Sequence, residues 1–156
     1  LQLRAEIDRE IERLVVRHRG VLHCRSGCAD CCRLTSVLPV EAEVLTQAIA
    51  LLPDALRDRI GAAVSDNDIC PLLVDGLCAV YQDRPIICRS HGLPLGYIDE
   101  EDETVAVSAC PLNFPPEVEI GIDDLLLMDE FNRRLLEINL RSWPAVRMPL
   151  VDLVRR

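Results

Sequence analysis

The chain opens with apolar side chains spaced three or four residues apart, which is the period of an α-helix with one buried face. This stripe, within residues 1–18, consists of Leu3, Ile7, Ile11, Leu14 and Val15. Glutamate and arginine fill the opposite face, and Gly20 follows as a stop signal. The pattern predicts an amphipathic helix in the N-terminal segment 1–19, with its charged face in solvent rather than in a binding site.

Two further helices are predicted before residue 65. Pro39 favours a helix start, because its fixed backbone angle suits the first helical turn. The apolar positions of this second helix are Val40, Val44, Leu45, Ala48 and Leu52. Pro53 interrupts the pattern, and residues 54–64 predict a short third helix.

The hydrophobic period changes after Cys70 to one that is typical of β-strands. Residues 71–74 and 77–81 flank the dipeptide Asp75-Gly76, which is a frequent two-residue hairpin turn. We therefore expect a β-hairpin here, followed by a short turn or helix over residues 85–89.

A second hairpin is predicted from residues 95–98 and 104–109, which are joined by an acidic loop. This loop, residues 99–103, lacks the glycine and the spaced ligands of a calcium-binding loop. We interpret it as a polar turn.

A long C-terminal helix is predicted over residues 122–142, capped by Asp123 or Asp124 and ending near Arg141. Its inner stripe, widened by Leu125 and Met128, consists of Leu127, Phe131, Leu135 and Ile138. We interpret the stripe as core packing, with a dimer contact as the alternative. The expected fold is α+β: a single domain, residues 1–156, mainly helical, with one or two short β-hairpins around a cysteine-ligated metal centre.

Composition and charge narrow the classes of partner. A chain of 156 residues can bury a hydrophobic core without covalent cross-links. It has no apolar run long enough for a membrane span and no secretory signal pattern, so we expect a cytoplasmic protein without membrane contact. The net charge is -9, and aromatic residues make up 3% of the chain. Both features argue against nucleic acid as a partner.

Eight cysteines are the strongest indication of the chemistry of this chain. They are Cys24, Cys28, Cys31, Cys32, Cys70, Cys78, Cys88 and Cys110. Disulfides persist mainly in oxidising compartments, the domain is large enough to fold without them, and the adjacent Cys31 and Cys32 make an awkward pair. We therefore expect thiolate ligands for metal, with disulfides and buried thiols as the alternatives.

The first four cysteines form a dense group, Cys24-x3-Cys28-x2-Cys31-Cys32. A spacing of two residues lets two thiolates reach one ion from a tight turn, as in zinc knuckles. Successive side chains usually point in different directions. Cys31 and Cys32 can therefore serve two metals, or one can ligate while the other packs.

The remaining four cysteines, Cys70, Cys78, Cys88 and Cys110, are spread over the two hairpins and the turn between them. A two-residue turn at Asp75-Gly76 places Cys78 opposite Leu73, so Cys70 and Cys78 would lie on different faces. Cys70 can ligate if the strand bends at Pro71, or it can belong with the first group.

Other polar residues could assist the thiolates. Four arginines lie near cysteines in sequence and could moderate the charge of a thiolate site, or could simply be exposed: Arg25, Arg33, Arg84 and Arg89. His91 is the best candidate for a nitrogen ligand, His23 could support Cys24, and we expect His18 on the helix surface.

Two separated motifs resemble one known family. Cys28-Ala29-Asp30-Cys31-Cys32 and the run 81–89, Tyr-Gln-Asp-Arg-Pro-Ile-Ile-Cys-Arg, are similar to the CxxCxxCC cysteine-cluster (YkgJ-type) family, a zinc- or iron-chelating domain. Cys70-Pro71 and the run 76–81 resemble its middle segment. The resemblance covers roughly residues 24–110. This chain has three residues between Cys24 and Cys28, where the family motif has two.

The resemblance implies a bacterial, cytoplasmic protein that binds zinc or iron, as ions or as an iron–sulfur cluster. A related branch includes flagellin lysine N-methylases, so an iron–sulfur enzyme is one alternative, and a metal store or chaperone is another. We see no nucleotide-binding glycine loop and no recognisable catalytic set. The expectation is a structural or regulatory metal-binding module that uses all eight cysteines, with the native metal, the division of ligands between sites, the protein partner and the oligomeric state left open.

Overall fold

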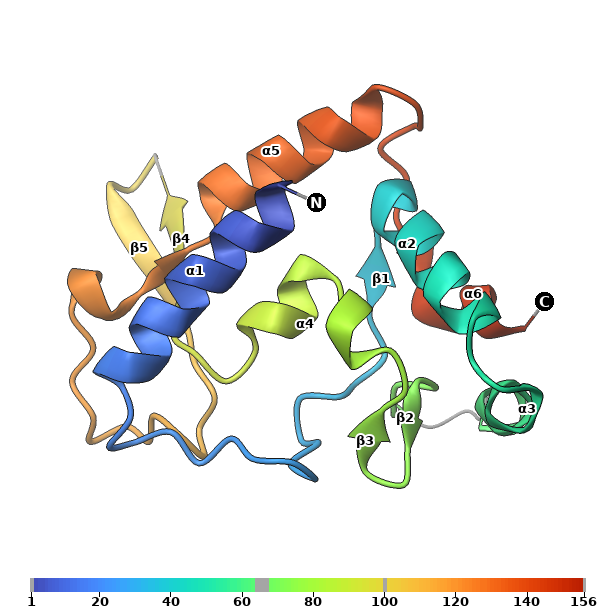
Figure 1. Ribbon diagram of the computed structural model, residues 1–156. Coiled ribbons are helices and arrows are strands. Elements are labelled where there is room, and N and C mark those ends of the chain that lie inside the picture. The colour runs from blue at the N-terminus through green and yellow to red at the C-terminus, as the bar shows by residue number, and fades with distance from the viewer. Residues whose placement is uncertain (1, 64–67, 100, 156) are drawn as a thin grey trace. The chain divides into compact units, whose positions relative to one another are not determined.

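The computed structural model describes residues 2–63, 68–99 and 101–155 and shows the expected α+β fold (Figure 1). The chain forms two compact units. Unit 1 comprises Leu1–Cys24 and Ile86–Leu135, and unit 2 comprises Arg25–Pro85 and Leu136–Arg156. Among the described residues, no helix combines the length and the apolar character that a membrane crossing would need.

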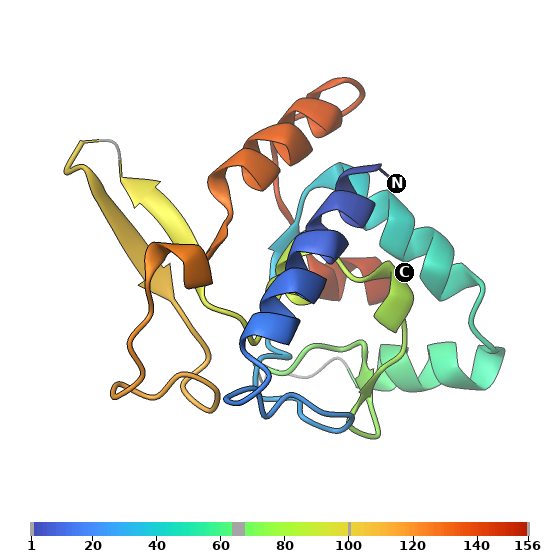
Figure 2. The same ribbon diagram turned by 60° about the vertical axis from the view of Figure 1, so that its left-hand side comes forward.

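Unit 1 packs helices beside a small sheet. Helix α1 (Gln2–Arg17) contacts the short helix α4 (Ile86–Ser90) and strand β6 (Leu126–Leu127). Strands β4 (Leu95–Asp99) and β5 (Thr104–Ser108) form the predicted second hairpin, and the strand order is β5-β4-β6. Figure 2 shows this hairpin in yellow.

The predicted N-terminal helix is confirmed as α1. Leu3, Ile7 and Leu14 are buried, and they hold this helix in unit 1 because the spacing places them on one face. Val15, which was assigned to the same stripe, is exposed.

The predicted long helix over residues 122–142 is wrong in its first part. Residues Ile122–Asp124 form a short 3-10 helix, β6 follows, and helix α5 begins only at Asp129 and ends at Leu140. The amides of Leu126 and Met128 donate to the carbonyls of Pro94 and Gly96, so this leucine run pairs in parallel with β4. The same apolar residues fit the spacing of a helix and the pairing of a strand. Hydrogen bonds to the neighbouring strand β4 stabilise the strand conformation here.

His18 is buried, so its expected surface position is also wrong. Its Nε2 atom lies 3.1 Å from the backbone oxygen of Asp124, and its ring meets Phe114 edge-on at 5.0 Å. This histidine therefore fastens the end of α1 within unit 1.

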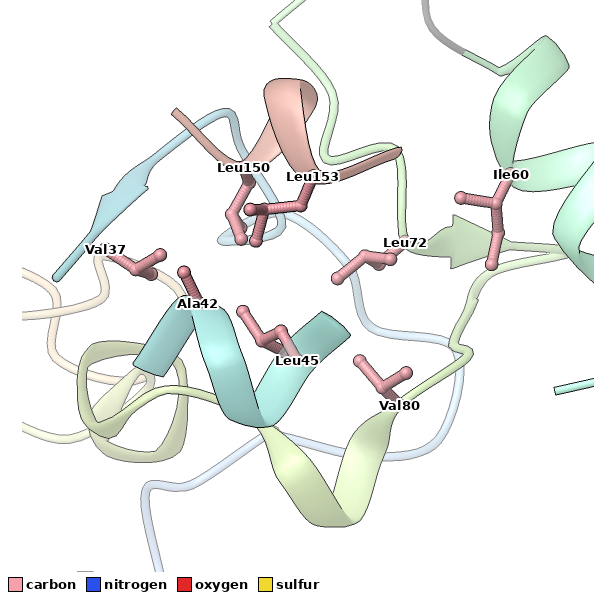
Figure 3. Packing of buried hydrophobic residues seen from close by; sticks show 8 residues of the cluster. All are labelled: Val37, Ala42, Leu45, Ile60, Leu72, Val80, Leu150 and Leu153. Carbon is pink, nitrogen blue, oxygen red and sulfur yellow. The ribbon is translucent and has the colours of Figure 1, made fainter. Parts of the chain in front are cut away.

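Unit 2 is built around helix α2 (Pro39–Ala50), which starts at the predicted proline. Its core, shown in Figure 3, consists of Val37, Ala42, Leu45, Ile60, Leu72, Val80, Leu150 and Leu153. Helix α3 (Asp54–Ala62) contacts strand β2 (Leu73–Val74), and Val64, the predicted end of this helix, lies outside the described residues.

Three elements of unit 2 were not predicted. Strand β1 (Ser36–Val37) pairs antiparallel with β7 (Met148–Pro149), and helix α6 (Leu150–Val154) follows and contacts α2. The two strands are two residues long, which is too short for any period to show in the sequence.

The first predicted hairpin is present but shorter than expected. Strand β2 (Leu73–Val74) pairs with β3 (Leu77–Cys78), and the 3-10 helix Tyr81–Asp83 replaces the end of the predicted second strand. Asp75 and Gly76 both have positive φ angles, 53° and 77°, as a type I′ turn requires. The predicted register is confirmed, because Cys78 pairs with Leu73.

Candidate metal centre

All eight cysteines are described, and none forms a disulfide. Five of them lie in unit 2, namely Cys28, Cys31, Cys32, Cys70 and Cys78, whereas Cys24, Cys88 and Cys110 lie in unit 1. The structure therefore divides the cysteines differently from the two groups that the sequence suggests. Across the described ranges, no three Cys, His, Asp or Glu side chains are arranged, as they stand, to hold a metal ion.

The loop that carries the dense cysteine motif is tied to the segment before the first hairpin. Two turns shape the loop. The backbone amide of Cys28 donates to the carbonyl of Arg25, and the amide of Cys32 donates to the carbonyl of Ala29. The amide of Cys70 donates to the carbonyl of Cys32 at 3.0 Å, and Arg33 forms a β-bridge with Ile69. Cys32 and Cys70 are thus neighbours in space, although 38 positions separate them in the numbering.

Cys70 lies outside the strand, which removes the geometric objection to its joining Cys78. The chain turns at Pro71, where the amide of Leu73 donates to the carbonyl of Cys70 at 3.0 Å, and β2 begins only at Leu73. The sequence analysis required such a bend at Pro71 for Cys70 to act as a ligand together with Cys78. Cys70 also lies beside Cys32 of the first motif, so both sequence alternatives describe part of the geometry.

Three thiols of unit 2 have raised pKa values. Burial raises the pKa of Cys32, and the charges that Cys70 and Cys78 would carry raise it further. Burial likewise raises the pKa of Cys70, with an added contribution from Cys78, and burial raises the pKa of Cys78. Without a cation, three neighbouring half-buried thiolates are therefore unfavourable.

Backbone amides near the Cys70 and Cys78 thiols favour their thiolate forms. The sulfur of Cys70 accepts hydrogen bonds from the amides of Leu72 and Leu73, and the sulfur of Cys78 accepts one from the amide of Val80. Each of these hydrogen bonds lowers the pKa of the thiol that accepts it, against the effect of burial. The local backbone thus offers donors to both sulfur atoms.

Arg84 supplies positive charge at the same place. Its guanidinium lowers the pKa values of Cys32 and Cys78, although burial outweighs it at both. The side chain is held in position because its Cζ atom lies 3.6 Å from the centre of the Tyr81 ring and its Nε donates to the Tyr81 carbonyl. By contrast, the Nη1 atom of Arg89 donates to both carboxylate oxygens of Asp8, and both of these residues are in unit 1.

A fourth sulfur adjoins the three coupled thiols. The thiol of Cys31 forms a hydrogen bond with Cys32. Four thiolates suit zinc or iron in tetrahedral coordination, so Cys31, Cys32, Cys70 and Cys78 have the chemistry to hold one such ion. Cys31 is exposed and the other three are half-buried. Cys28 is exposed in the same loop, and its predicted role as a ligand stays a prediction.

In unit 1, Cys24 contacts a buried asparagine that the sequence analysis missed. Asn113 is 2% exposed, and its Nδ2 atom lies 3.2 Å from the sulfur of Cys24. A polar residue between the apolar Leu112 and Phe114, three positions after Cys110, was the available signal. Cys88 lies on α4, and His91, just after this helix, is half-buried; the roles predicted for both stay predictions.

Comparison with known proteins places the chain in a family. The model of the family described as "CxxCxxCC: Putative zinc- or iron-chelating domain" matches residues 23–111, which is more than half of the 156-residue chain. The chain belongs to the CxxCxxCC family. A search of curated proteins and a search of solved structures each found no match.

The CxxCxxCC match includes all eight cysteines and residues of both units. Helices α1, α5 and α6 lie outside it. The family assignment therefore rests on the segments that carry the thiols, and the flanking helices complete the cores of the two units.

Proposed function

We propose that this CxxCxxCC protein is a structural or regulatory metal-binding module in which Cys31, Cys32, Cys70 and Cys78 hold a zinc or iron ion. The observation that carries the proposal is the gathering of the Cys32, Cys70 and Cys78 thiols, which lie close enough that charge on Cys78 raises the pKa values of Cys32 and Cys70. Buried like charges repel unless a cation compensates them, and a divalent metal ion is the cation that thiolates bind most strongly.

The surroundings of the four sulfur atoms suit an ion of this kind. A divalent ion with four thiolates carries a net charge of about -2, which the guanidinium of Arg84 would moderate. Amide donors to Cys70 and Cys78 would stabilise the sulfur atoms in their charged state. Both features belong to the folded chain of unit 2 and need no further partner.

A structural role follows from where the four residues lie in the chain. Cys31 and Cys32 belong to a loop with little regular structure, whereas Cys70 and Cys78 flank the first hairpin. Binding free energy at such a site becomes folding free energy, because the unfolded chain has no preformed site. The ion would connect the loop to the hairpin and to the core of unit 2, to which Leu72 and Val80 belong.

Metal storage or transfer is the second candidate, and the exposure of Cys28 and Cys31 favours it. An exposed thiolate can be approached by a competing ligand, so an ion held partly by Cys31 could leave quickly. A structural ion would instead exchange slowly.

Purification without oxygen, followed by measurement of zinc, iron and sulfide per chain and of the visible spectrum, tests the proposal. Bound zinc or iron that a strong chelator removes, with loss of amide protection in the cysteine region, is the expected result. Iron with an equal amount of sulfide would indicate an iron–sulfur cluster and favour the enzyme alternative over a single bound ion. A chain that binds neither metal, or whose amide protection is unchanged after complete metal removal, would contradict the structural module.

A further inference from the structure

The strongest unexplained feature of unit 1 is the side chain of Asn113. Its Oδ1 accepts the amide of His23 at 2.8 Å, and its Nδ2 donates to the carbonyl of Gly92 at 2.7 Å and to the sulfur of Cys24 at 3.2 Å. All three hydrogen bonds lie within unit 1. One buried amide therefore joins the Cys24 segment to the segment that follows α4.

The orientation of this amide is fixed by its backbone partners. The His23 amide can only donate, so it requires the oxygen of Asn113, and the Gly92 carbonyl can only accept, so it requires the nitrogen. The atom that faces the Cys24 sulfur is therefore an N–H donor. Sulfur accepts such a bond more strongly when it carries negative charge, as it does when bound to a metal.

Gly92 brings the backbone close to the same sulfur. Its φ angle is 96°, in the region that favours glycine, and a Cβ atom at this position would lie only 2.6 Å from the Cys24 sulfur. A side chain here would displace the thiol. Gly92 and Asn113 therefore both contact the Cys24 thiol and restrict its position.

The same asparagine connects the segments of the other unit 1 cysteines. Gly92 follows α4, which carries Cys88, by two residues. The amides of Asn113 and Phe114 both donate to the carbonyl of Cys110, so Asn113 lies in the turn that Cys110 begins. All three cysteines of unit 1 are thus carried by segments that meet at Asn113.

The spacing of the cysteine motif departs from the family pattern next to Cys24. Cys24 is separated from Cys28 by one residue more than the family motif has, and the boundary between the units falls directly after Cys24. Cys28, Cys31 and Cys32 lie on the other side of that boundary. The extra residue therefore coincides with the point where the chain passes from one unit to the other.

We propose that Asn113 is the positioning residue of Cys24, and that it directs this thiolate to act with Cys88 and Cys110 rather than with Cys28, Cys31 and Cys32. This inference rests on the proposed function, because it assigns ligands within a metal-binding protein. It divides the thiolates into a unit 1 group and a unit 2 group, each assembled by its own backbone.

The test uses the full chain, reduced and free of oxygen, titrated with Cd²⁺ alone. Charge-transfer absorbance counts the thiolates bound to cadmium, and competition with a chelator gives the affinity. Asn113→Ala removes the donor to sulfur. Asn139→Ala is the matched control, since Asn139 is also fully buried and bonds to Val40, Trp143 and Pro144, none of which is a thiol.

We expect Asn113→Ala to weaken cadmium binding by the unit 1 thiols about 10- to 100-fold, as is usual when a residue that supports a ligand is lost. Binding that depends on Cys70 should be unchanged, and Asn139→Ala should leave both groups unchanged. Cys24→Ser should add no further loss in a Cys88→Ser background, but should add a loss in a Cys32→Ser background. If Asn113→Ala does not fold, Asn113→Asp, which keeps the shape and loses the donor, is measured instead.

Three results would overturn the inference. Asn113→Ala could behave like Asn139→Ala, its effect could fall on the Cys70-dependent binding, or Cys24→Ser could be non-additive with Cys32→Ser. In each case the wild-type chain still binds cadmium through thiolates, so the proposed function stands. A wild-type chain that binds no cadmium through thiolates contradicts the proposed function itself.

Discussion

Substitution of Gly92 by alanine probes the contact between the backbone and the Cys24 sulfur. The new Cβ atom would lie 2.6 Å from that sulfur, whereas ordinary contact begins at 3.4 Å, so the sulfur has to move by about 0.8 Å. A shift of this size breaks the 3.2 Å hydrogen bond from Asn113, which costs about 0.5–1.5 kcal/mol. The positive φ angle adds about 1–2 kcal/mol for a residue with a side chain. We expect Gly92→Ala to lower the free energy of unfolding by about 1.5–3.5 kcal/mol.

Gly27→Ala is the matched control for backbone strain. Its φ angle is 88°, close to the 96° of Gly92, but nothing lies within 4 Å of the added Cβ atom. This variant should therefore lose only the strain component, about 1–2 kcal/mol. The difference between the two variants isolates displacement of the thiol.

A double-mutant cycle with Cys24→Ala completes the assay. Urea unfolding followed by far-UV circular dichroism, in the same excess of zinc for every variant, gives each free energy. Because the Cys24→Ala chain has no sulfur at this position to displace, Gly92→Ala should cost about 1 kcal/mol less in that background. An equal cost in both backgrounds would mean that the loss of stability comes from the backbone alone and not from displacement of the thiol.

Two further predictions concern the cores and the ion pairs. Leu45→Ala, at a fully buried position in unit 2, should lower the free energy of unfolding by about 2–5 kcal/mol in a urea titration, whereas Leu51→Ala, at a side chain that is 87% exposed, should stay within about 0.5 kcal/mol of wild type. Equal losses would contradict the assigned core. A hydrogen bond from Arg134 lowers the pKa of Glu6 below its ordinary 4.5, so this pair stabilises the fold at neutral pH and loses its effect as pH falls through the lowered value. Glu6→Gln should flatten the acid side of the stability–pH curve, and an unchanged acid side would show that the pair contributes nothing.

The sequence predicted those elements whose signals are local. Pro39 predicted the start of α2, and Asp75-Gly76 predicted both the hairpin turn and the pairing of Cys78 with Leu73. These features depend on backbone preferences of one or two residues, which the surrounding fold reinforces.

Elements that depend on distant partners were missed or assigned wrongly. Leu127 has helical spacing with Phe131 and Leu135, yet Leu126 and Leu127 pair with β4, some 31 positions earlier in the chain. β1 pairs with β7 across more than a hundred positions, and no local pattern reports such a contact. Tertiary context decides these regions, so a single sequence cannot specify them.

In the candidate site, too, local features were predictable from the sequence and features that depend on distant contacts were not. All eight cysteines are recognisable from spacing and from the family motif, but their grouping depends on the fold. The sequence placed Cys24 with Cys28, and Cys70 with Cys110, whereas the structure separates both pairs between the units. Asn113 carried too weak a signal, because an isolated asparagine in a loop has many roles and its partners are far away in sequence.

If the unit 2 thiols bind one metal ion together, loss of Cys70 should abolish that site, and a zinc competition titration of Cys70→Ser measures this. Leu73→Ala is the control. Leu73 pairs with Cys78 in the hairpin, and its side chain has no atom that can ligate a metal ion. We predict that Cys70→Ser loses one tightly bound zinc per chain and that Leu73→Ala retains it. A Cys70→Ser chain that binds zinc with the stoichiometry and affinity of the wild type would contradict the account.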